Sequence, residues 1–157
     1  MAAAKSLPEG QRSVTPHLVV RDAARAIDFY KEALGAEELM RLPAPGGALM
    51  HAELRIGDSK IFLVDEFPEP REEGVGSPRQ LGATTVTIHL FVDDVDAAIQ
   101  RASAAGAKVT LPPTDMFWGD RYGRILDPFG HSWSLATHVK DLTPEEIQRN
   151  MAGAFES

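Results

Sequence analysis

Histidines and carboxylates at related places along the chain are the residues best suited to do chemistry. His17 and His89 each stand two residues after a threonine, within two passages that read alike. Asp65 and His138 lie near the ends of two later apolar runs. Neutral imidazole binds zinc, iron, nickel and similar ions, and it also transfers protons near pH 7. Three interpretations of the histidines stay open. They could bind a metal ion, they could contact a ligand or transfer a proton, or they could be hydrogen-bonded residues of a cavity wall.

A second cluster combines aromatic rings with a cation. Trp118, Arg121 and Tyr122 stand close together where a loop leads into a predicted strand. In a functional interpretation they form a lid or wall, Trp118 stacks on a ligand and Arg121 pairs with an anionic group of that ligand. The alternative is a structural loop in which Arg121 pairs with Asp120 or Asp115.

One further pair, His51 and Glu53, shares a face of a predicted strand. The two side chains could act as a general base and the carboxylate that orients it. The simpler interpretation is a solvated strand edge.

The passages that hold the two histidines repeat one pattern. The first covers residues 15–22 and the second residues 87–94, offset by 72 positions. Each leads into a helical pattern followed by a glycine, Gly35 in the first and Gly106 in the second. Such repeats define an architecture. Two units of about 60 residues each bury little core alone, so we expect the halves to share a core and to form a site between them.

Periodicity, caps and turns assign the same order of elements to both halves. In the first half we expect strand 14–20, helix 23–34 and strands 36–42, 49–56 and 60–65. In the second half we expect strand 84–92, helix 94–105, strand 107–111, a loop at 112–120, and strands 121–126 and 132–137. A capping box between Thr143 and Glu146 then begins a C-terminal helix. Its apolar stripe, Ile147, Met151 and Phe155, is expected to dock on the body or on a second subunit.

Alternation along the strands sorts the side chains onto two faces of each sheet. One face is apolar and should carry the helix, and Trp133 falls on this side. The other face mixes apolar and polar groups. Joining the two mixed faces gives a mostly apolar pocket with a few polar groups, which is the usual form of a small-molecule site. The polar lining that we expect is Thr15, His17, Asp65, Thr87, His89, Ser134 and His138.

Composition excludes several classes of function. The chain has 157 residues, a net charge of −7 and no cysteine. An acidic chain disfavours nonspecific nucleic-acid binding, and the lack of cysteine excludes thiol catalysis, disulfides and cysteine-ligated zinc. No apolar stretch approaches the roughly 20 residues of a membrane span, and residues 1–11 lack the pattern of a secretory signal. We therefore expect a cytoplasmic protein with no nucleic-acid or membrane partner.

Three features together resemble the vicinal oxygen chelate superfamily, which includes glyoxalase I, extradiol dioxygenases and the fosfomycin and bleomycin resistance proteins. They are the two β-α-β-β-β patterns, the helix end at 27–35 and the Asp-Pro-Phe-Gly-His turn at 127–131. The segment 115–123 resembles the PhnB-like branch. The resemblance implies an α+β fold, in which two tandem βαβββ modules form a curved mixed sheet around a cup-shaped cavity. It also implies a homodimer.

The resemblance covers about residues 14–138 and guides the domain boundaries that we expect. Residues 1–12 would form a disordered tail, and residues 13–139 a single domain. This domain would consist of a repeat at 13–65, a linker at 66–83 and a second repeat at 84–139. Residues 140–157 would form a C-terminal helix.

Metal enzymes of that superfamily take one ligand from the first and one from the fourth strand of each half. The matching positions here are Thr15, Leu63, Thr87 and Ser134. None is a usual divalent-metal ligand in that superfamily, so we predict no cofactor. His17 and His89 lie two residues further along their strands, or about 6.6 Å. This leaves a divalent metal at a displaced site as the alternative.

We expect the protein to bind a small organic molecule between the modules without the usual metal. The ligand-binding residues that we predict are His17, Asp65, His89, Trp118, Arg121, Tyr122, Ser134 and His138. The alternative is a metal-dependent lyase, isomerase or dioxygenase with a displaced His17/His89 metal site. A third interpretation is a stress or signalling partner protein with a vestigial cavity.

Overall fold

The computed structural model describes residues 6–68 and 73–156 and has two compact units, Met1–Gly82 (unit 1) and Ala83–Ser157 (unit 2). Each unit contains elements in the order β-α-β-β-β and one four-stranded mixed sheet. The tandem α+β modules are therefore confirmed. The strands form two four-stranded sheets, one in each unit, and the cup-shaped cavity between the modules remains a prediction.

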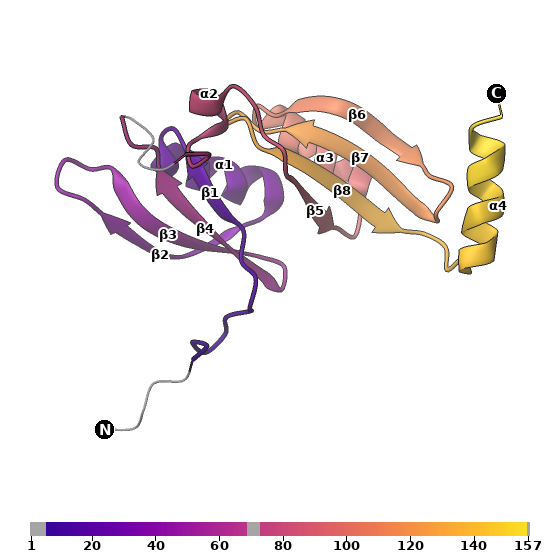
Figure 1. Cartoon of the computed structure of the whole chain (residues 1–157), viewed down its shortest axis with the longest axis horizontal. Coiled ribbons are helices and arrows are strands. Elements are labelled where there is room, and N and C mark those ends of the chain that lie inside the picture. Colours follow the sequence, from indigo (N-terminus) through magenta and orange to yellow (C-terminus); the bar gives the residue numbers. More distant parts are fainter. Residues whose placement is uncertain (1–5, 69–72, 157) are drawn as a thin grey trace. The chain divides into compact units, whose positions relative to one another are not determined.

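In unit 1 the sheet order is β1–β4–β3–β2, and α1 lies against one face of the sheet (Figure 1). β1 runs parallel to β4, and β3 runs antiparallel to both β4 and β2. The helix has the predicted bounds because Asp22 caps its first turn and Gly35 ends it at φ 65°. The elements are β1 (His17–Val20), α1 (Ala23–Leu34), β2 (Glu37–Pro43), β3 (Leu49–Ile56) and β4 (Ser59–Asp65).

A short helix, α2 (Pro78–Leu81), lies in the segment that we expected to be an irregular linker. It begins at Ser77, which forms a capping box with Gln80. Ser77 is fully buried, and its hydroxyl donates to Glu66, which also pairs with Arg21. These contacts tie the segment after β4 to the start of α1.

Parts of the two expected irregular segments lie outside the described residues. These parts are 1–5 of the tail 1–12 and 69–72 of the linker 66–83. Residues 6–12 form neither helix nor strand, and the amide of Gln11 donates to the carbonyl of Pro8.

In unit 2 the sheet order is β5–β8–β7–β6, with α3 against one face (Figure 1). Gly123 allows this helix to lie close to β7, because a Cβ atom there would stand 2.2 Å from Cδ1 of Ile99. No helix in the described ranges is both long and apolar enough to span a membrane. The elements are β5 (Thr87–Phe91), α3 (Val95–Ala104), β6 (Lys108–Asp115), β7 (Asp120–Leu126), β8 (Ser132–His138) and α4 (Pro144–Ala154).

The main difference from the predicted elements is in β6, which continues to Asp115 where we expected a loop at 112–120. Pro112 and Pro113 fit there because β6 is an edge strand and its register with β7 shifts between Leu111 and Thr114. β1 and β5 are shorter than expected, since each pairs only along the length of its single neighbouring strand.

A buried carboxylate holds the turn between β7 and β8. Asp127 accepts hydrogen bonds from the amides of Phe129 and His131, both at 2.9 Å, and from the indole of Trp133 at 3.0 Å. Trp133 is 1% exposed, which confirms its predicted place in the core. The turn is therefore a structural device that fixes the start of β8.

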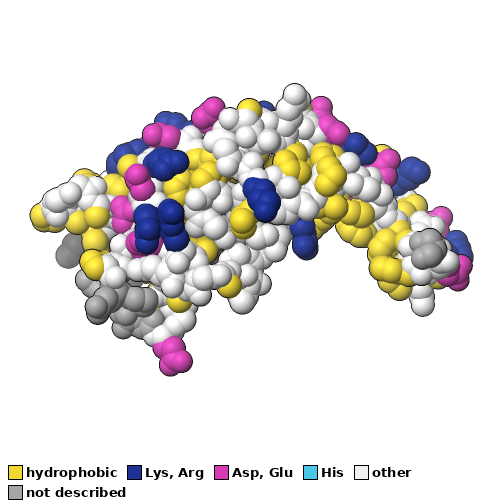
Figure 2. All heavy atoms as spheres, turned by 90° about the horizontal axis from the view of Figure 1, so that it is seen from above, with side chains coloured by type: hydrophobic (Ala, Val, Ile, Leu, Met, Phe, Trp, Pro, Cys, Tyr) yellow, Lys and Arg dark blue, Asp and Glu magenta, His cyan; other side chains and the backbone are white. Residues whose placement is uncertain are grey.

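The C-terminal helix α4 begins at the predicted capping box between Thr143 and Glu146. None of its residues is buried, and Phe155 is 78% exposed. Figure 2 shows hydrophobic side chains at the surface around this helix, at the right of the view. It contacts Phe117 of unit 2, whose carbonyl accepts from Asn150 at 3.2 Å and whose ring lies 6.3 Å from that of Phe155.

The Asp127→Ala substitution should destabilise unit 2 by about 3 kcal/mol or more, because three buried donors each lose their acceptor. The matched control is Asp58→Ala in the hairpin turn between β3 and β4, where the carboxylate accepts from the Ser59 hydroxyl at the surface and, within residues 6–68 and 73–156, from no other donor. That change should stay within about 0.5 kcal/mol. Denaturant unfolding measures both, and equal losses would contradict the structural role of Asp127.

Candidate functional site

The face of the unit 2 sheet that α3 does not cover carries a cluster of rings and polar groups. Strand register places His89 opposite Ser134, and Ser134 opposite Arg124, so these side chains project from the same face. His89 Nδ1 lies 2.7 Å from Ser134 Oγ. The imidazole is nearly parallel to the ring of Tyr122 at 5.9 Å and meets the ring of Phe91 edge-on at 4.7 Å. We call His89, Phe91, Tyr122, Arg124 and Ser134 the open-face cluster.

A largely buried carboxylate organises the neighbouring part of this face. Asp120 Oδ1 lies 2.7 Å from His138 Nδ1, and Asp120 Oδ2 accepts from the indole of Trp118 at 3.0 Å. Trp118 in turn meets the ring of Tyr122 edge-on at 5.5 Å. His138 Nε2 lies 2.8 Å from Asp141. Hydrogen bonds to Asp141 and Asp120 raise the pKa of His138, because both carboxylates stabilise the imidazolium.

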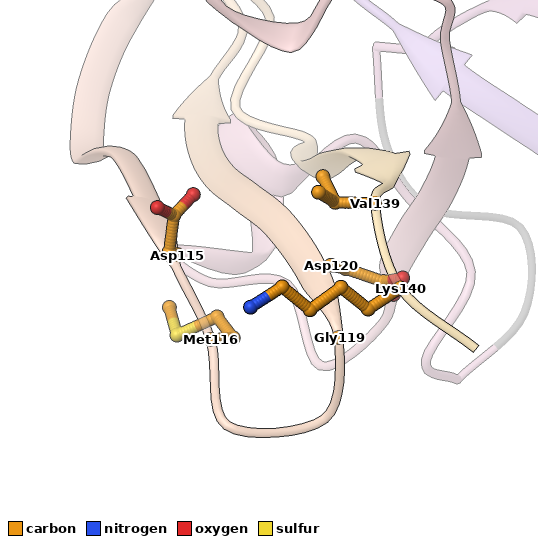
Figure 3. A pocket seen from close by; sticks show the side chains of 6 residues that line it. All are labelled: Asp115, Met116, Gly119, Asp120, Val139 and Lys140. Atoms are coloured by element: carbon orange, nitrogen blue, oxygen red, sulfur yellow. The ribbon is translucent and has the colours of Figure 1, made fainter. Parts of the chain in front are cut away.

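Two hollows in unit 2 flank the pair of Asp120 and His138. The first measures about 80 Å³, and Figure 3 shows the side chain of Lys140 extending across it toward Met116. This volume is too small for a drug-sized molecule. The second is more open, measures about 460 Å³ and is lined by Phe91, Val92, Asp93, Thr137 and His138. The open hollow therefore adjoins the open-face cluster at Phe91.

In unit 1, His17 lies on the uncovered face of the sheet among rings of its own. Its ring centroid stands 5.9 Å from that of Phe62 and 6.3 Å from that of His51. His51 Nε2 lies 3.4 Å from Glu53, which also pairs with Lys60 at 3.5 Å. Desolvation and the neighbouring His51 lower the pKa of His17. His51 and Glu53 are half-buried on the interior strand β3, so the simpler interpretation of a solvated strand edge is wrong.

Asp65 does not share a face with His17. The register pairs His17 with Phe62 but Val20 with Asp65, so Asp65 faces α1. Its two oxygens accept from the amides of Ala23 and Leu49, each at 2.7 Å. We expected Asp65 in the cavity lining, and the structure instead places its carboxylate at the starts of α1 and β3. The two faces of β4 are therefore exchanged relative to our expectation: Phe62 shares the face of His17, and Asp65 lies on the helix face.

Arg121 likewise faces the helix. It neighbours Tyr122 on β7 and therefore projects from the opposite face of the sheet. Its guanidinium donates to Asp96 of α3 at 2.6 and 2.9 Å and to Asp115 at 3.1 Å. The structural alternative, in which Arg121 pairs with Asp115, therefore describes this residue, and Asp96 is a partner that the sequence did not reveal.

The four positions matched to metal ligands carry side chains that do not fit a divalent cation. Leu63 is fully buried beneath α1. The hydroxyl of Thr87 lies 3.2 Å from that of Ser132, Ser134 is bonded to His89, and Thr15 precedes β1. Across residues 6–68 and 73–156, no three His, Asp or Glu side chains are grouped so as to hold a metal ion.

The structure thus gathers five of the predicted ligand-binding residues in unit 2. Arg121 lies on the opposite face of that sheet, and His17 and Asp65 belong to unit 1. His89, Ser134 and Tyr122 belong to the open-face cluster, and Trp118 and His138 adjoin it through Asp120. Sequence reasoning missed Arg124 and the anchoring role of Asp120. The available signal was the period of two along β7, which puts Asp120, Tyr122 and Arg124 on one face.

The family follows from a comparison with known proteins. The sequence profile of the Glyoxalase/Bleomycin resistance protein/Dioxygenase superfamily matches residues 12–135. The chain belongs to this superfamily. The resemblance drawn from the repeat, the helix end and the turn at 127–131 is thereby confirmed.

Individual proteins resemble the chain in sequence or in structure. The uncharacterized protein Mb0911c of Mycobacterium bovis is 51% identical over 140 residues, which are 89% of this chain and 92% of that protein. The crystal structure of TioX from Micromonospora sp. ML1 has a TM-score of 0.65 and 29% identity, covering 82% of this chain and all of TioX. A Bacillus cereus structure titled a putative 3-demethylubiquinone-9 3-methyltransferase, PhnB protein, has a TM-score of 0.61 and 14% identity. It covers 80% of this chain and 99% of that one, and it shows a shared fold.

Two histidines should titrate on opposite sides of the ordinary histidine pKa of about 6.5. His17 should titrate below this value because of desolvation and His51, and His138 above it because of Asp141 and Asp120. The Asp141→Asn substitution should lower the pKa of His138 and leave that of His17 unchanged. NMR titration of the imidazole C2 protons, assigned with single His→Gln variants, measures both.

The same titration has a consequence for stability. Because the pKa of His138 is raised on folding, its stabilising contribution is fully present below about pH 6.5. It is lost as the pH rises through the folded-state value. A His138 that titrates at or below 6.5 would contradict the assigned partners.

Proposed function

We propose that the protein binds a small organic molecule with a planar, apolar part on the open face of unit 2. The observation that carries this proposal is the contact of His89 with both Ser134 and Tyr122. Ser134 is only 3% exposed, so its hydroxyl is a fixed partner for Nδ1 of His89. That bond leaves the Nε2 atom of an exposed imidazole available to a ligand.

Side-chain size across the face supports the same proposal. On the interior strand β8, the residues facing this side include Ser132, Ser134 and Ala136, which are small. Larger rings stand on the neighbouring strands, with Phe91 on β5 and Tyr122 on β7. Phe91 is 63% exposed, although an aromatic ring of this kind favours burial. Ser134 and Ala136 are only 3% and 0% exposed, so a planar molecule would lie against the rings of Phe91 and Tyr122 and meet the imidazole of His89.

The pair of Asp120 and His138 extends this surface toward the open hollow. His138 lies two residues beyond Ala136 on β8, and therefore on the same face. Its two bonds to carboxylates orient the imidazole, and Trp118 is oriented by the same Asp120. We infer that this end of the face sets the orientation of a bound molecule.

The donor set argues against a metal at the positions that the metal enzymes of the superfamily use. A lyase, isomerase or dioxygenase of this superfamily that used its metal would need ligands where the chain has Thr15, Leu63, Thr87 and Ser134. Threonine, leucine and serine side chains do not supply the imidazole and carboxylate groups that such ions prefer. Binding without the usual metal, in a cytoplasmic homodimer, is the function that we propose.

A panel of small planar heteroaromatic compounds, screened by thermal shift and confirmed by calorimetry, tests the proposal. At least one compound should bind the wild-type protein, and both His89→Ala and Tyr122→Leu should weaken that binding about tenfold, since each removes a ring or polar contact. The matched control His131→Ala changes a histidine in the turn between β7 and β8 and should bind as the wild type does.

Metal content provides the opposing outcome. A stoichiometric iron, nickel, zinc or manganese ion retained after purification without chelators would overturn the proposal, provided that the His17→Ala/His89→Ala variant loses it. Binders whose affinity is the same in the wild type, His89→Ala and Tyr122→Leu would also count against the open face as the site.

A further inference from the structure

Arg124 presents a free cationic group on the open face of unit 2. The residue is exposed, and its register partner on β8 is Ser134. Its Nε atom donates to the hydroxyl of Tyr122 at 2.8 Å, and the centre of its guanidinium lies 5.9 Å from the centroid of that ring. This contact holds one side of the guanidinium in place. Among the described residues, neither terminal nitrogen of Arg124 has a hydrogen-bond or ion-pair partner.

The charges on the same face leave this cation without compensation. The register identifies the side chains on this face of the four strands as Thr87, His89, Phe91, Ser132, Ser134, Ala136, His138, Asp120, Tyr122, Arg124, Leu126, Lys108, Leu111 and Thr114. Asp120 is the single carboxylate in this set, and both of its oxygens are engaged, by Trp118 and by His138. No acidic side chain in the set is therefore free to neutralise Arg124.

The neighbouring arginine shows what a structural arginine looks like in this strand. Arg121 is bound by Asp96 and Asp115 on the helix face. Arg124, three residues later, faces the other way and donates to the phenol of Tyr122. In a protein of net charge −7, carboxylates to pair with an exposed arginine are plentiful. Among the described residues no carboxylate pairs with Arg124, which makes it a position for an anion that comes from outside the chain.

We propose that Arg124 binds the carboxylate of a planar aromatic acid on the open face of unit 2. This inference rests on the proposed function and names its ligand class. The planar fork of the guanidinium matches a carboxylate through two parallel hydrogen bonds, and Tyr122 fixes the direction of the fork. The rings of Tyr122 and Phe91 cover the apolar part of the ligand, and His89 Nε2 supplies a further polar contact.

A matched pair of probes tests the contribution of the charge. The probes are 2-naphthoate and the neutral 2-naphthamide, which have the same ring system and nearly the same shape. Calorimetry or NMR titration at low salt should show naphthoate binding about tenfold more tightly than naphthamide, as expected for one charge-assisted bidentate contact. Added salt should weaken naphthoate binding and leave naphthamide binding nearly unchanged.

Variants of Arg124 assign the effect to this residue. Arg124→Gln should reduce naphthoate binding to the level of naphthamide and leave naphthamide binding unchanged, whereas Arg124→Lys should retain part of the preference. Arg149→Gln changes an exposed arginine of α4 in the same unit and should behave as the wild type does. Thermal unfolding of each variant checks that the fold is intact.

The outcomes separate the inference from the proposed function. Equal binding of the two probes to the wild type, with both weakened in Tyr122→Leu, overturns the anion site and leaves the proposed function in place. A naphthoate preference that survives in Arg124→Gln also overturns the assignment. If neither probe binds, the aromatic-acid inference fails, and the heteroaromatic panel with His89→Ala and Tyr122→Leu decides the proposed function separately.

Discussion

The parallel pairing of the first and last strands of each module is the constraint on which the rest of the structure depends. It sets β1 beside β4 and β5 beside β8 in a fixed register. Because successive side chains point to opposite faces, that register sends Leu18 and Leu90 toward the helices and His17 and His89 away from them. A slip of one residue would place an imidazole in each core and a leucine on each open face. The hydrophobic effect on one face therefore determines the chemistry available on the other.

The two modules show how one scaffold gives equivalent residues different surroundings. His17 and His89 occupy matching places in the repeat, yet their partners come from strands that have diverged. His17 meets Phe62 and His51, and desolvation together with the neighbouring His51 lowers its pKa. His89 meets the hydroxyl of Ser134 and the ring of Tyr122. The repeat thus preserves the direction of a side chain, while the neighbouring strand decides what that side chain can do.

What the sequence predicted correctly was encoded within a few residues. The bounds of α1 follow from Asp22 and Gly35, and the turn held by Asp127 follows from a short motif. The placement of Asp65 was wrong because it depends on the register between β1 and β4, which are distant in the sequence. The pairing of Arg121 with Asp96 spans 25 positions and could not be read from either segment alone. Arg124 was missed although the period of two along β7 puts it on the face of Tyr122, because its role depends on which side chains of the neighbouring strands share that face.

Two arginines on β7 show why position in the pleat matters more than residue type. Arg121 and Arg124 have the same side chain and stand three residues apart, which is an odd number and puts them on opposite faces. On the helix face, carboxylates of α3 and β6 are within reach and pair with Arg121 at the surface. On the open face, no side chain in the part of the chain that the structure describes pairs with the terminal nitrogens of Arg124. The guanidinium of Arg121 is therefore paired within the fold, whereas that of Arg124 is available for recognition.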